Sequence, residues 1–288
     1  MKATCFKKPI GPKTLSGADL LRRTFKDLMR IHKPSYRGIF LDLFSGKGGI
    51  THYLSKFGCP VISVDVCVDA RFDLLNIDVC NVIFGWIKSG CVLGIWLATP
   101  STTWSLARHG PVGTSWGPLR SNQHLFGVPG LSPTDQAKVR LGNSTFRFTF
   151  NTIKLAIRFK IPCFLENPAQ SMMWKVPRLR KLCDVPCSRL FVCDFCQFGS
   201  RWRKRTHIQS WYSQDCNELN FTCSGRGGKC NATGKFHIVL KGQDRISKQL
   251  WTHLAQPYPP KFAATCAKLL KHSADQLHTF FLGKHFGI

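Results

Sequence analysis

The sequence predicts an α/β fold with a doubly wound parallel sheet, and three observations carry this prediction. Apolar, β-prone runs alternate with segments of helical spacing between residues 38 and 168. The run at 38–44 opens into a glycine-rich turn, and the run at 92–97 breaks abruptly into proline and hydroxyl residues. Strands that alternate with helices in this way are typical of parallel sheets with helices on both faces.

The first strand and its turn predict a nucleotide-binding unit. Residues 38–44 are followed by Ser45-Gly46-Lys47-Gly48-Gly49 and by a helix expected over 50–57. Glycines allow backbone N–H groups to approach a ligand closely at the N-terminus of a helix. A second strand, 60–65, ends in Asp65, and a carboxylate at this distance from the glycines can accept both ribose hydroxyls of a cofactor. The alternative role of Asp65 is a helix cap or a turn residue.

The next apolar stretch, 74–79, contains Asp78 and continues the alternation, with a helix expected over 81–89. The strand at 92–97 then leads into Thr99-Pro100-Ser101-Thr102-Thr103-Trp104-Ser105. Ligands of open α/β sheets bind just beyond the carboxyl ends of strands, so this loop is a candidate for the catalytic part of a site. The alternative is an ordinary loop of proline, serine and threonine.

A loop-like segment, 109–133, and a helix expected over 135–160 precede the next strand, 161–168. That strand contains Glu166, and the only other glutamate of the chain is Glu218. A carboxyl group at the end of an apolar strand is expected to have a raised pKa and to exchange protons near neutral pH. The alternative role of Glu166 is to cap the segment that follows Pro168.

The charge of the chain indicates the class of its partner. Lys+Arg 41 against Asp+Glu 15 give a net charge of +26, which favours a polyanion, most simply nucleic acid, through neutralisation of phosphates. An RNA-bound structural protein or a binder of anionic membranes would also carry such a charge. The densest basic run, around Trp202, suits phosphate contact with some stacking, although a solvated face is the ordinary alternative. Its cations are Arg201, Arg203, Lys204 and Arg205.

Fourteen cysteines occur without the apolar N-terminal segment of a secretory signal, which favours reduced thiols in an intracellular protein, nuclear or cytoplasmic. No apolar run approaches the length of a membrane span. One group of soft ligands is sufficient for a tetrahedral zinc ion, and free thiols are the alternative. This candidate metal set consists of Cys193, Cys196, Cys223, Cys230 and His237.

Together these segments resemble the cytosine-C5 DNA methyltransferase family, in order and over 39–271. Residues 42–49 resemble its first motif, which holds S-adenosylmethionine, and 100–105 resemble its Pro-Cys loop. Residues 166–168 resemble its Glu-Asn-Val motif, whose glutamate pairs with the cytosine edge. The remaining matches are 198–205, to its aromatic-glycine and basic segment, and 258–260 with a helix expected over 261–271, to its closing motif.

The resemblance implies a Rossmann-like methyltransferase sheet with a small, basic, cysteine-rich insertion. It implies S-adenosylmethionine as cofactor and nucleic acid as substrate, with DNA favoured and RNA as the alternative. Cofactor contacts are then expected at Asp42, Phe44, Gly46, Gly48, Gly49, Asp65, Asp78 and Pro100. Catalytic roles are expected at Ser101, Glu166 and Arg203, and phosphate contacts at Arg201, Arg203, Lys204 and Arg205.

One residue departs from the family, because position 101 is serine where the family has its nucleophilic cysteine. Methylation at C5 needs a covalent adduct at C6, and a thiolate is far more available at neutral pH than an alkoxide. Three consequences are open at this point. They are weak or lost C5 chemistry, methylation of another atom that needs no nucleophile, and a protein that binds nucleic acid without turnover.

The expected organisation has four parts. A basic N-terminal helix or arm covers 1–37, and the S-adenosylmethionine-binding core covers 38–200. A small basic recognition region rich in Cys and His covers 201–250. A C-terminal helix region, 251–288, completes the core.

Overall fold

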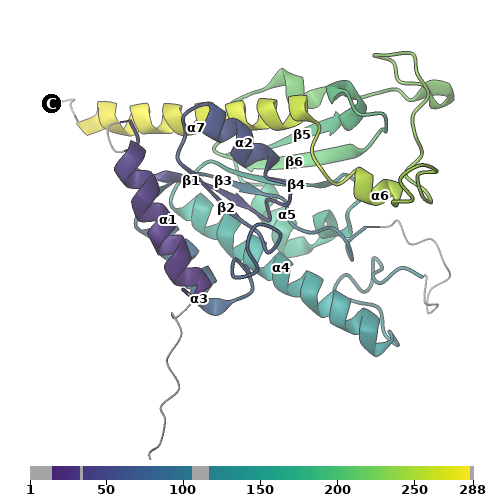
Figure 1. Ribbon diagram of the computed structural model, residues 1–288, viewed down its shortest axis with the longest axis horizontal. Coiled ribbons are helices and arrows are strands. Elements are labelled where there is room, and N and C mark those ends of the chain that lie inside the picture. Colours follow the sequence, from purple (N-terminus) through teal and green to yellow (C-terminus); the bar gives the residue numbers. More distant parts are fainter. Residues whose placement is uncertain (1–14, 33–34, 106–116, 286–288) are drawn as a thin grey trace, which may run out of the picture.

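Six strands form the centre of the fold, in the order β2-β1-β3-β4-β6-β5. The computed structural model describes residues 15–32, 35–105 and 117–285 (Figure 1). It confirms the α/β class with a mostly parallel sheet. The parallel strands are β1 (Ile39–Leu43), β2 (Val61–Val64), β3 (Val92–Leu97) and β4 (Cys163–Pro168), whereas β6 (Arg205–Trp211) runs antiparallel to both β4 and β5 (Ser188–Asp194).

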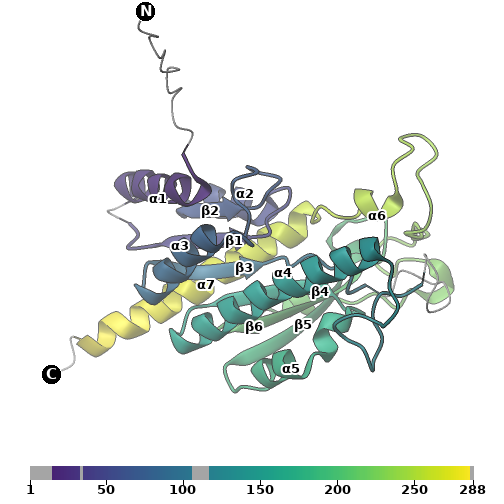
Figure 2. The ribbon, with the colours of Figure 1, turned by 90° about the horizontal axis from the view of Figure 1, so that it is seen from below.

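Helices lie on both faces of this sheet (Figures 1 and 2). On one face lie α2 (Gly49–Lys56) and α7 (Pro260–His285). On the other lie α1 (Gly17–His32), α3 (Ile77–Lys88), α4 (Pro133–Arg158) and α5 (Pro177–Cys183). The short helices are α6 (Trp251–Leu254), η1 (Met172–Lys175), η2 (Phe195–Phe198), η3 (Asn217–Asn220) and η4 (Arg226–Gly228).

The alternation of side chains along the strands divides the interior into two cores. In β1, Ile39, Leu41 and Leu43 pack with α1 and α3, whereas Phe40 packs with α2 and α7. Successive side chains of a strand point to opposite faces, so a strand buried on both sides is apolar at nearly every position. This explains why the parallel strands are visible in the sequence as continuous apolar runs.

The stretch 74–79 is not a strand, which corrects the expected alternation. Asn76 accepts hydrogen bonds through Oδ1 from the backbone N–H groups of Asp78 (2.9 Å) and Val79 (3.4 Å). Asn76 therefore caps α3, and Asp78 lies exposed in the first helical turn. An asparagine at the start of an apolar-periodic segment is a helix start signal, and here it determines the local structure.

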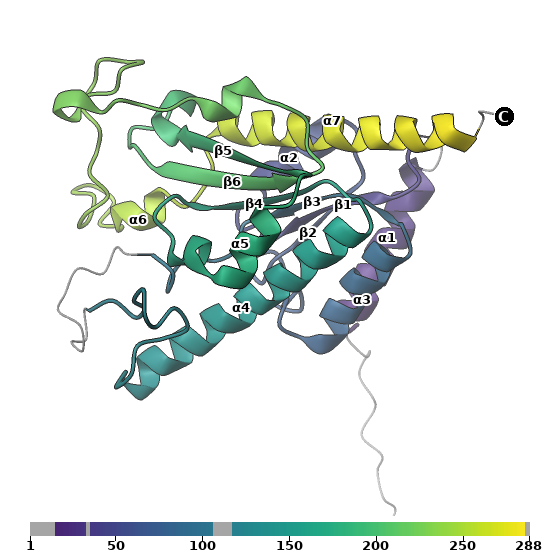
Figure 3. The same cartoon turned by 180° about the vertical axis from the view of Figure 1, so that it is seen from behind.

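The boundary expected at residue 200 is not a boundary of the sheet. Residues 205–211 form β6, which lies between β4 and β5 and belongs to the central sheet. The irregular segment follows β6 instead, and Figure 3 shows its loops beside α6. Within 212–250 the only pairings among described residues outside named strands are the isolated bridges Lys229↔Phe236 and Gln243↔Leu250. The helix expected over 261–271 extends to His285.

Three expected features fall partly beyond the part of the chain that the structure describes. These are the N-terminal arm, at residues 1–14 and 33–34, the long loop, at residues 109–116, and the C-terminal helix region, at residues 286–288. Among the helices of the described residues, none combines the length and the apolar character that crossing a membrane requires.

Candidate functional site

The carboxyl ends of β1 and β3 mark the switch point of the sheet. The chain passes from β1 to β2 on one side, and β3 then pairs with β1 on the other side. Crevices of open α/β sheets form where the strand order reverses in this way. Two adjoining cavities lie here, of about 670 Å³ and about 510 Å³. The residues that line both are Phe44, Asp65, Cys67, Pro100 and Thr102.

The larger cavity brings together most of the residues that the sequence singled out. It is lined by the glycine turn, the loop after β3, the end of β4 and the segment before α7. Among the expected site residues, those that line it are Phe44, Gly46, Gly48, Gly49, Asp65, Pro100, Ser101, Glu166 and Lys204. Those that line neither cavity are Asp42, Asp78, Arg201, Arg203 and Arg205.

The glycine turn adopts a backbone that other residues rarely take. Gly46 has φ of 53° and Gly48 has φ of 68°, and Gly48 is the N-cap of α2. Both values lie in the left-handed region, which glycine enters without steric cost. The turn therefore places its backbone directly against the larger cavity at the start of a helix, where N–H groups favour an anionic ligand.

Asp42, where a cofactor contact is expected, supports the turn from behind and lines neither cavity. Its buried Oδ2 accepts hydrogen bonds from the Thr51 backbone N–H (3.0 Å) and hydroxyl (2.7 Å). Burial raises the pKa of Asp42 to about 6, although the two Thr51 hydrogen bonds act in the opposite direction. Asp42 thus fixes the first turn of α2 against β1.

Asp65 holds the open end of the turn. Its Oδ2 accepts a hydrogen bond from the Gly46 N–H (3.0 Å), and its Oδ1 accepts one from the Cys67 N–H (2.7 Å). The carboxylate lines both cavities, so it lies where the two join. This is the position expected from its place at the end of the second strand.

The smaller cavity is mostly apolar. Its two acids are Asp65 and Asp73, and Asp78 does not line it. Phe44, which lines both cavities, has φ of 57°, a left-handed conformation that costs energy in a residue with a side chain. The sequence signal for Asp73 was its place just before the cap of α3. The apolar lining consists of Phe44, Val66, Phe72, Leu74, Leu75 and Leu141, together with the aliphatic part of Lys138.

The loop after β3 is fastened at its base. The Thr99 and Thr149 hydroxyls hydrogen-bond to each other (2.6 Å), and Asn167 Nδ2 donates to the Thr99 carbonyl (2.7 Å). The Ser101 carbonyl accepts from the Trp104 N–H (2.9 Å). Ser101 therefore stands on a turn whose first end, at Thr99, is held by both α4 and β4.

Arg120 holds the far end of the same loop and was not identified from the sequence. Its buried guanidinium donates to the Thr103 carbonyl (3.0 Å) and hydroxyl (2.8 Å) and lies 3.5 Å from the centre of the Trp104 ring. It also donates to the Leu125 carbonyl (2.7 Å) and to Asn143 Oδ1 (2.8 Å). Burial lowers the pKa of Arg120 to about 10. The only signal in the sequence was its position in a long loop, where nothing distinguishes it from other basic residues.

Glu166 is buried at the inner wall of the larger cavity. Its Oε2 accepts a hydrogen bond from the Tyr258 hydroxyl (2.9 Å), and that hydroxyl accepts one from Trp96 Nε1 (3.3 Å). Its Oε1 is buried and has no partner among the described residues. Burial raises the pKa of Glu166, as expected from the sequence, while Lys204 and the Tyr258 hydrogen bond act to lower it. A carboxyl group with one unpaired oxygen can bind a donor or an acceptor on a ligand.

The basic run contributes Lys204 to the larger cavity, whereas Arg203, for which a catalytic role is expected, lines neither cavity. Arg203 Nε lies 3.3 Å from Asp194 Oδ2, and Arg205 Nη2 lies 2.7 Å from the same oxygen. Alternate residues of an extended chain point to opposite sides, so the lysine between the two arginines is directed away from Asp194. Arg203 and Arg205 are therefore committed to a buried carboxylate.

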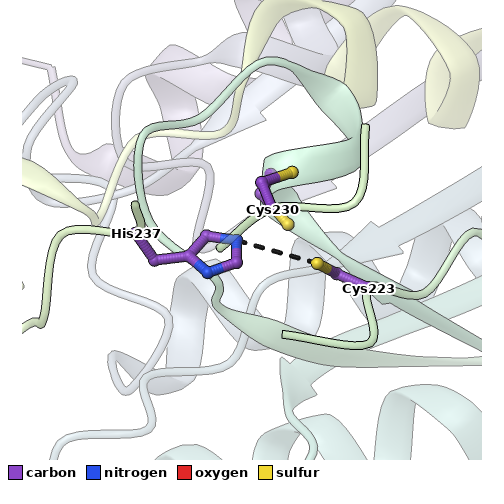
Figure 4. A group of neighbouring side chains, drawn as sticks. Cys223, Cys230 and His237 are labelled. Atoms are coloured by element: carbon purple, nitrogen blue, oxygen red, sulfur yellow. Dashed lines mark hydrogen bonds between the residues drawn. The ribbon is translucent and has the colours of Figure 1, made fainter. Parts of the chain in front are cut away.

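The second site brings together four of the five candidate metal ligands. The ligand atoms of Cys196, Cys223, Cys230 and His237 all lie within 4.8 Å of one another, so this group could hold a metal ion. In Figure 4 the side chains of Cys223, Cys230 and His237 converge, with Cys223 Sγ 3.7 Å from His237 Nε2. Cys193 is not part of the group, because it lies in β5 and its side chain is buried in the core beside α7.

Comparison of the chain with protein-family models and with curated protein sequences found no match.

Proposed function

We propose that this protein is an S-adenosylmethionine-dependent methyltransferase that acts on a base of nucleic acid, DNA in preference to RNA. The observation that carries the proposal is that the glycine turn, Asp65, the Ser101 loop and Glu166 line adjoining cavities at the switch point of the sheet. These residues are far apart in sequence. Each offers a chemistry that one part of such a reaction requires.

The two cavities suit a cofactor with a polar end and an aromatic end. Each volume lies within the range of roughly 300–1,000 Å³ that is typical of small-molecule sites. The larger cavity offers backbone N–H groups at the start of α2, and the smaller one offers an apolar wall with Asp73 beside it. Asp65, at their junction, suits the hydroxyls of a ribose. When bound, S-adenosylmethionine supplies an electrophilic methyl group.

The order of the strands is compatible with this cofactor. The sheet departs from an all-parallel dinucleotide-binding sheet in having antiparallel β6 between β4 and β5. A doubly wound, Rossmann-like methyltransferase sheet with a cysteine-rich insertion after β6 accounts for the two helical layers and for the irregular segment. Lys204, the residue directly before the reversed strand β6, also lines the larger cavity.

Glu166 suits the edge of a base. Tyr258 occupies one carboxyl oxygen, and the buried unpaired oxygen is left for a ligand. A raised pKa allows the neutral carboxyl to donate a proton to a ring nitrogen, and the ionised form to accept from an exocyclic amine. A base reaches such a recessed group only after it leaves its stack. The surrounding positive charge, with Lys204 nearest, suits the phosphates that accompany it.

Ser101 favours a methyl acceptor that requires no covalent attack by the protein. Among the described residues, no hydrogen bond joins the Ser101 hydroxyl to a basic side chain that would activate it as a nucleophile. Methylation of an exocyclic nitrogen requires only positioning and removal of a proton. Glu166 would hold the base by its edge and take the proton that the amine loses.

A second candidate function is nucleic-acid binding without turnover, and Ser101 is the observation that favours it. The two functions are separated by a transfer assay with tritium-labelled S-adenosylmethionine on single- and double-stranded DNA and RNA, followed by mass analysis of the modified nucleoside. We expect incorporation that falls by about 10² to 10⁴ in Glu166→Gln, the range that general acid–base catalysis contributes.

The matched control for this assay is Glu218→Gln, because Glu218 is the other glutamate of the chain and is exposed on η3. It should leave incorporation unchanged. No incorporation on any of the four substrates, by a protein that binds both S-adenosylmethionine and nucleic acid, would reject the enzyme and leave the binding function.

A further inference from the structure

The group of Cys196, Cys223, Cys230 and His237 joins η2 to the irregular segment after β6, and the proposed methyl transfer does not use it. Cys196 lies in η2, directly after β5, and the other three residues lie in the segment itself. The three cysteines are buried and His237 is half-buried. All three thiols are free.

The donor set and its spacing match a tetrahedral zinc site. Three thiolates and one imidazole are a standard set for structural zinc, with Zn–S of about 2.3 Å and Zn–N of about 2.0–2.1 Å. Such bond lengths put neighbouring donor atoms roughly 3.5–3.8 Å apart at tetrahedral angles. Cys223 Sγ and His237 Nε2 lie 3.7 Å apart, and the whole set lies within 4.8 Å.

A second layer of hydrogen bonds orients these ligands. Gln197 Nε2 lies 3.6 Å from Cys196 Sγ and 3.8 Å from Cys230 Sγ, so one amide group can donate toward two thiolates. The Cys223 N–H donates to Asp194 Oδ2 (2.6 Å), the carboxylate that also binds Arg203 and Arg205. Outer-shell partners of this kind hold metal ligands in position and offset the charge of the thiolates.

Few apolar side chains of the segment are buried. The three cysteines form a buried cluster of their own, separate from the two cores of the sheet. Apolar side chains of the segment are exposed instead, with Phe236 69%, Val239 73% and Ile246 93% accessible. Small units without an apolar core usually need a metal or disulfides to remain folded.

We propose that Cys196, Cys223, Cys230 and His237 bind one structural Zn²⁺ that fastens residues 221–237 to the end of β5. The ion would join η2, which is part of the sheet region, to a segment whose described residues pair with one another through isolated bridges. This inference stands on the ligand geometry and holds whether or not the chain transfers a methyl group.

The first test is the metal content of the full chain, purified after expression with added zinc. Elemental analysis should find about one zinc per chain in the wild type. Cys230→Ser should retain less than about a tenth of it, whereas Cys216→Ser, a free cysteine of the same segment outside the group, should retain all of it. His237→Cys should also keep the zinc, because four thiolates are an equally good set. This last variant separates the loss of a ligand from a failure to fold.

The second test replaces zinc with Co²⁺ in the wild-type chain. Tetrahedral thiolate coordination should give intense visible absorption bands and a sulfur-to-cobalt charge-transfer band, which strengthens in His237→Cys. Iron with inorganic sulfide, a disulfide between two of the three cysteines, or absence of metal in the folded chain would each overturn the proposal. Equal loss of zinc in Cys216→Ser and Cys230→Ser would overturn the ligand assignment.

The third test concerns the structural role. Removal of zinc by a chelator should raise amide hydrogen exchange in residues 217–240 at least tenfold and leave β1, β3 and β4 protected. Unchanged exchange in the segment after complete removal of zinc would contradict a fastening role.

Discussion

Asp42 and Glu166 are both buried carboxyl groups whose pKa burial raises, but their partners give them different roles. One oxygen of Asp42 accepts two hydrogen bonds from Thr51, and the residue thereby supports α2. Glu166 keeps one buried oxygen unpaired beside the larger cavity. The difference lies in local geometry, so the sequence could nominate both residues but could not separate a supporting acid from one available to a ligand.

Asp42 should make the stability of the protein depend on pH. Its pKa is about 6 in the folded chain against an unfolded value near 3.8, so the folded state binds the proton more tightly. The stabilisation is therefore complete below about pH 4 and is lost as pH rises through about 6. Asp42→Asn removes this loss, and its free energy of unfolding relative to wild type should increase by about 2 kcal/mol between pH 4 and pH 7.5. Urea unfolding of both proteins at the two pH values measures this, and a constant difference would contradict it.

Ser101 provides a test of the reaction type. If the acceptor needs no covalent nucleophile, Ser101→Ala should keep methyl transfer within about threefold, because only a hydroxyl at the cavity wall is lost. If the serine forms an adduct, the same change should abolish transfer. Single-turnover rates with identical substrate distinguish the two outcomes. Ser101→Cys, analysed in parallel by mass, shows whether the site shifts product to the C5 atom once a thiolate is present.

At the scale of elements, the loop after β3 depends on close contact with α4. Trp104 Nε1 donates to the Gly142 carbonyl (3.3 Å), and Arg120 lies over the Trp104 ring. A Cβ at Gly142 would lie 2.3 Å from Thr103 Oγ1 and 2.9 Å from Arg120 Nη2. A glycine in the middle of α4 therefore allows the loop that carries Ser101 to approach the helix.

Two helical glycines give a matched pair of substitutions. Gly142→Ala should destabilise the protein by about 1–3 kcal/mol, because the methyl group overfills a packed contact, and should also impair methyl transfer. Gly85→Ala, in α3, should stabilise it by about 0.5–1 kcal/mol, because nothing lies within 4 Å of its Cβ and alanine favours the helix. Thermal unfolding measures both, and a shift of the same sign in the two variants would contradict the packing argument.

The elements that the sequence revealed are those buried on both faces. β1, β2, β3 and β4 are continuous apolar runs, and their positions were predicted to within about two residues. β5 and β6 were not predicted, because neither begins as an apolar run. Arg189 is the second residue of β5, and Arg205, the last residue of the basic run, is the first residue of β6. The error at 74–79 has a different cause, since a single capping side chain, Asn76, decided between helix and strand.

At the scale of the whole molecule, the excess of positive charge is not uniformly available to a partner. Asp194 binds both Arg203 and Arg205, and Lys204 lies at the cavity. A count of basic residues in the sequence cannot show which of them already pair with a carboxylate of the protein. Of the four cations expected to contact phosphate, the structure places Arg201 at the exposed surface beyond these contacts.

Binding of nucleic acid should therefore depend strongly on salt. If six to ten phosphates are neutralised, affinity should fall by about 10³ to 10⁵ between 50 and 200 mM salt. Arg201→Ala should reduce the slope of log affinity against log salt by about 1. Arg22→Ala, whose guanidinium pairs with Asp19 on α1, should leave the slope unchanged. Fluorescence anisotropy with a labelled oligonucleotide measures these slopes, and binding independent of salt would contradict a phosphate-based interaction.

Site residues could be predicted where an acidic residue, a rare type in this chain, lies at the end of an apolar strand, as Glu166 and Asp65 do. They could not be predicted where long-range packing decides the outcome. Arg120 has no distinguishing pattern in the sequence. Nor does the sequence show that Arg203 pairs with Asp194 while Lys204 lines the larger cavity. Four of the five candidate metal ligands lie together in the structure. The fifth, Cys193, faces the core from β5 instead.

The central claim, a cofactor across the two cavities, is tested most directly by isothermal titration with S-adenosylmethionine. The wild type should bind one equivalent, and Asp65→Ala should weaken binding by about 10- to 150-fold, the range for a lost hydrogen bond to a charged group. Asp78→Ala should bind as the wild type does, because Asp78 lies exposed in α3 and lines neither cavity. Absence of binding by the wild type, or an equal loss in the two variants, would contradict the account.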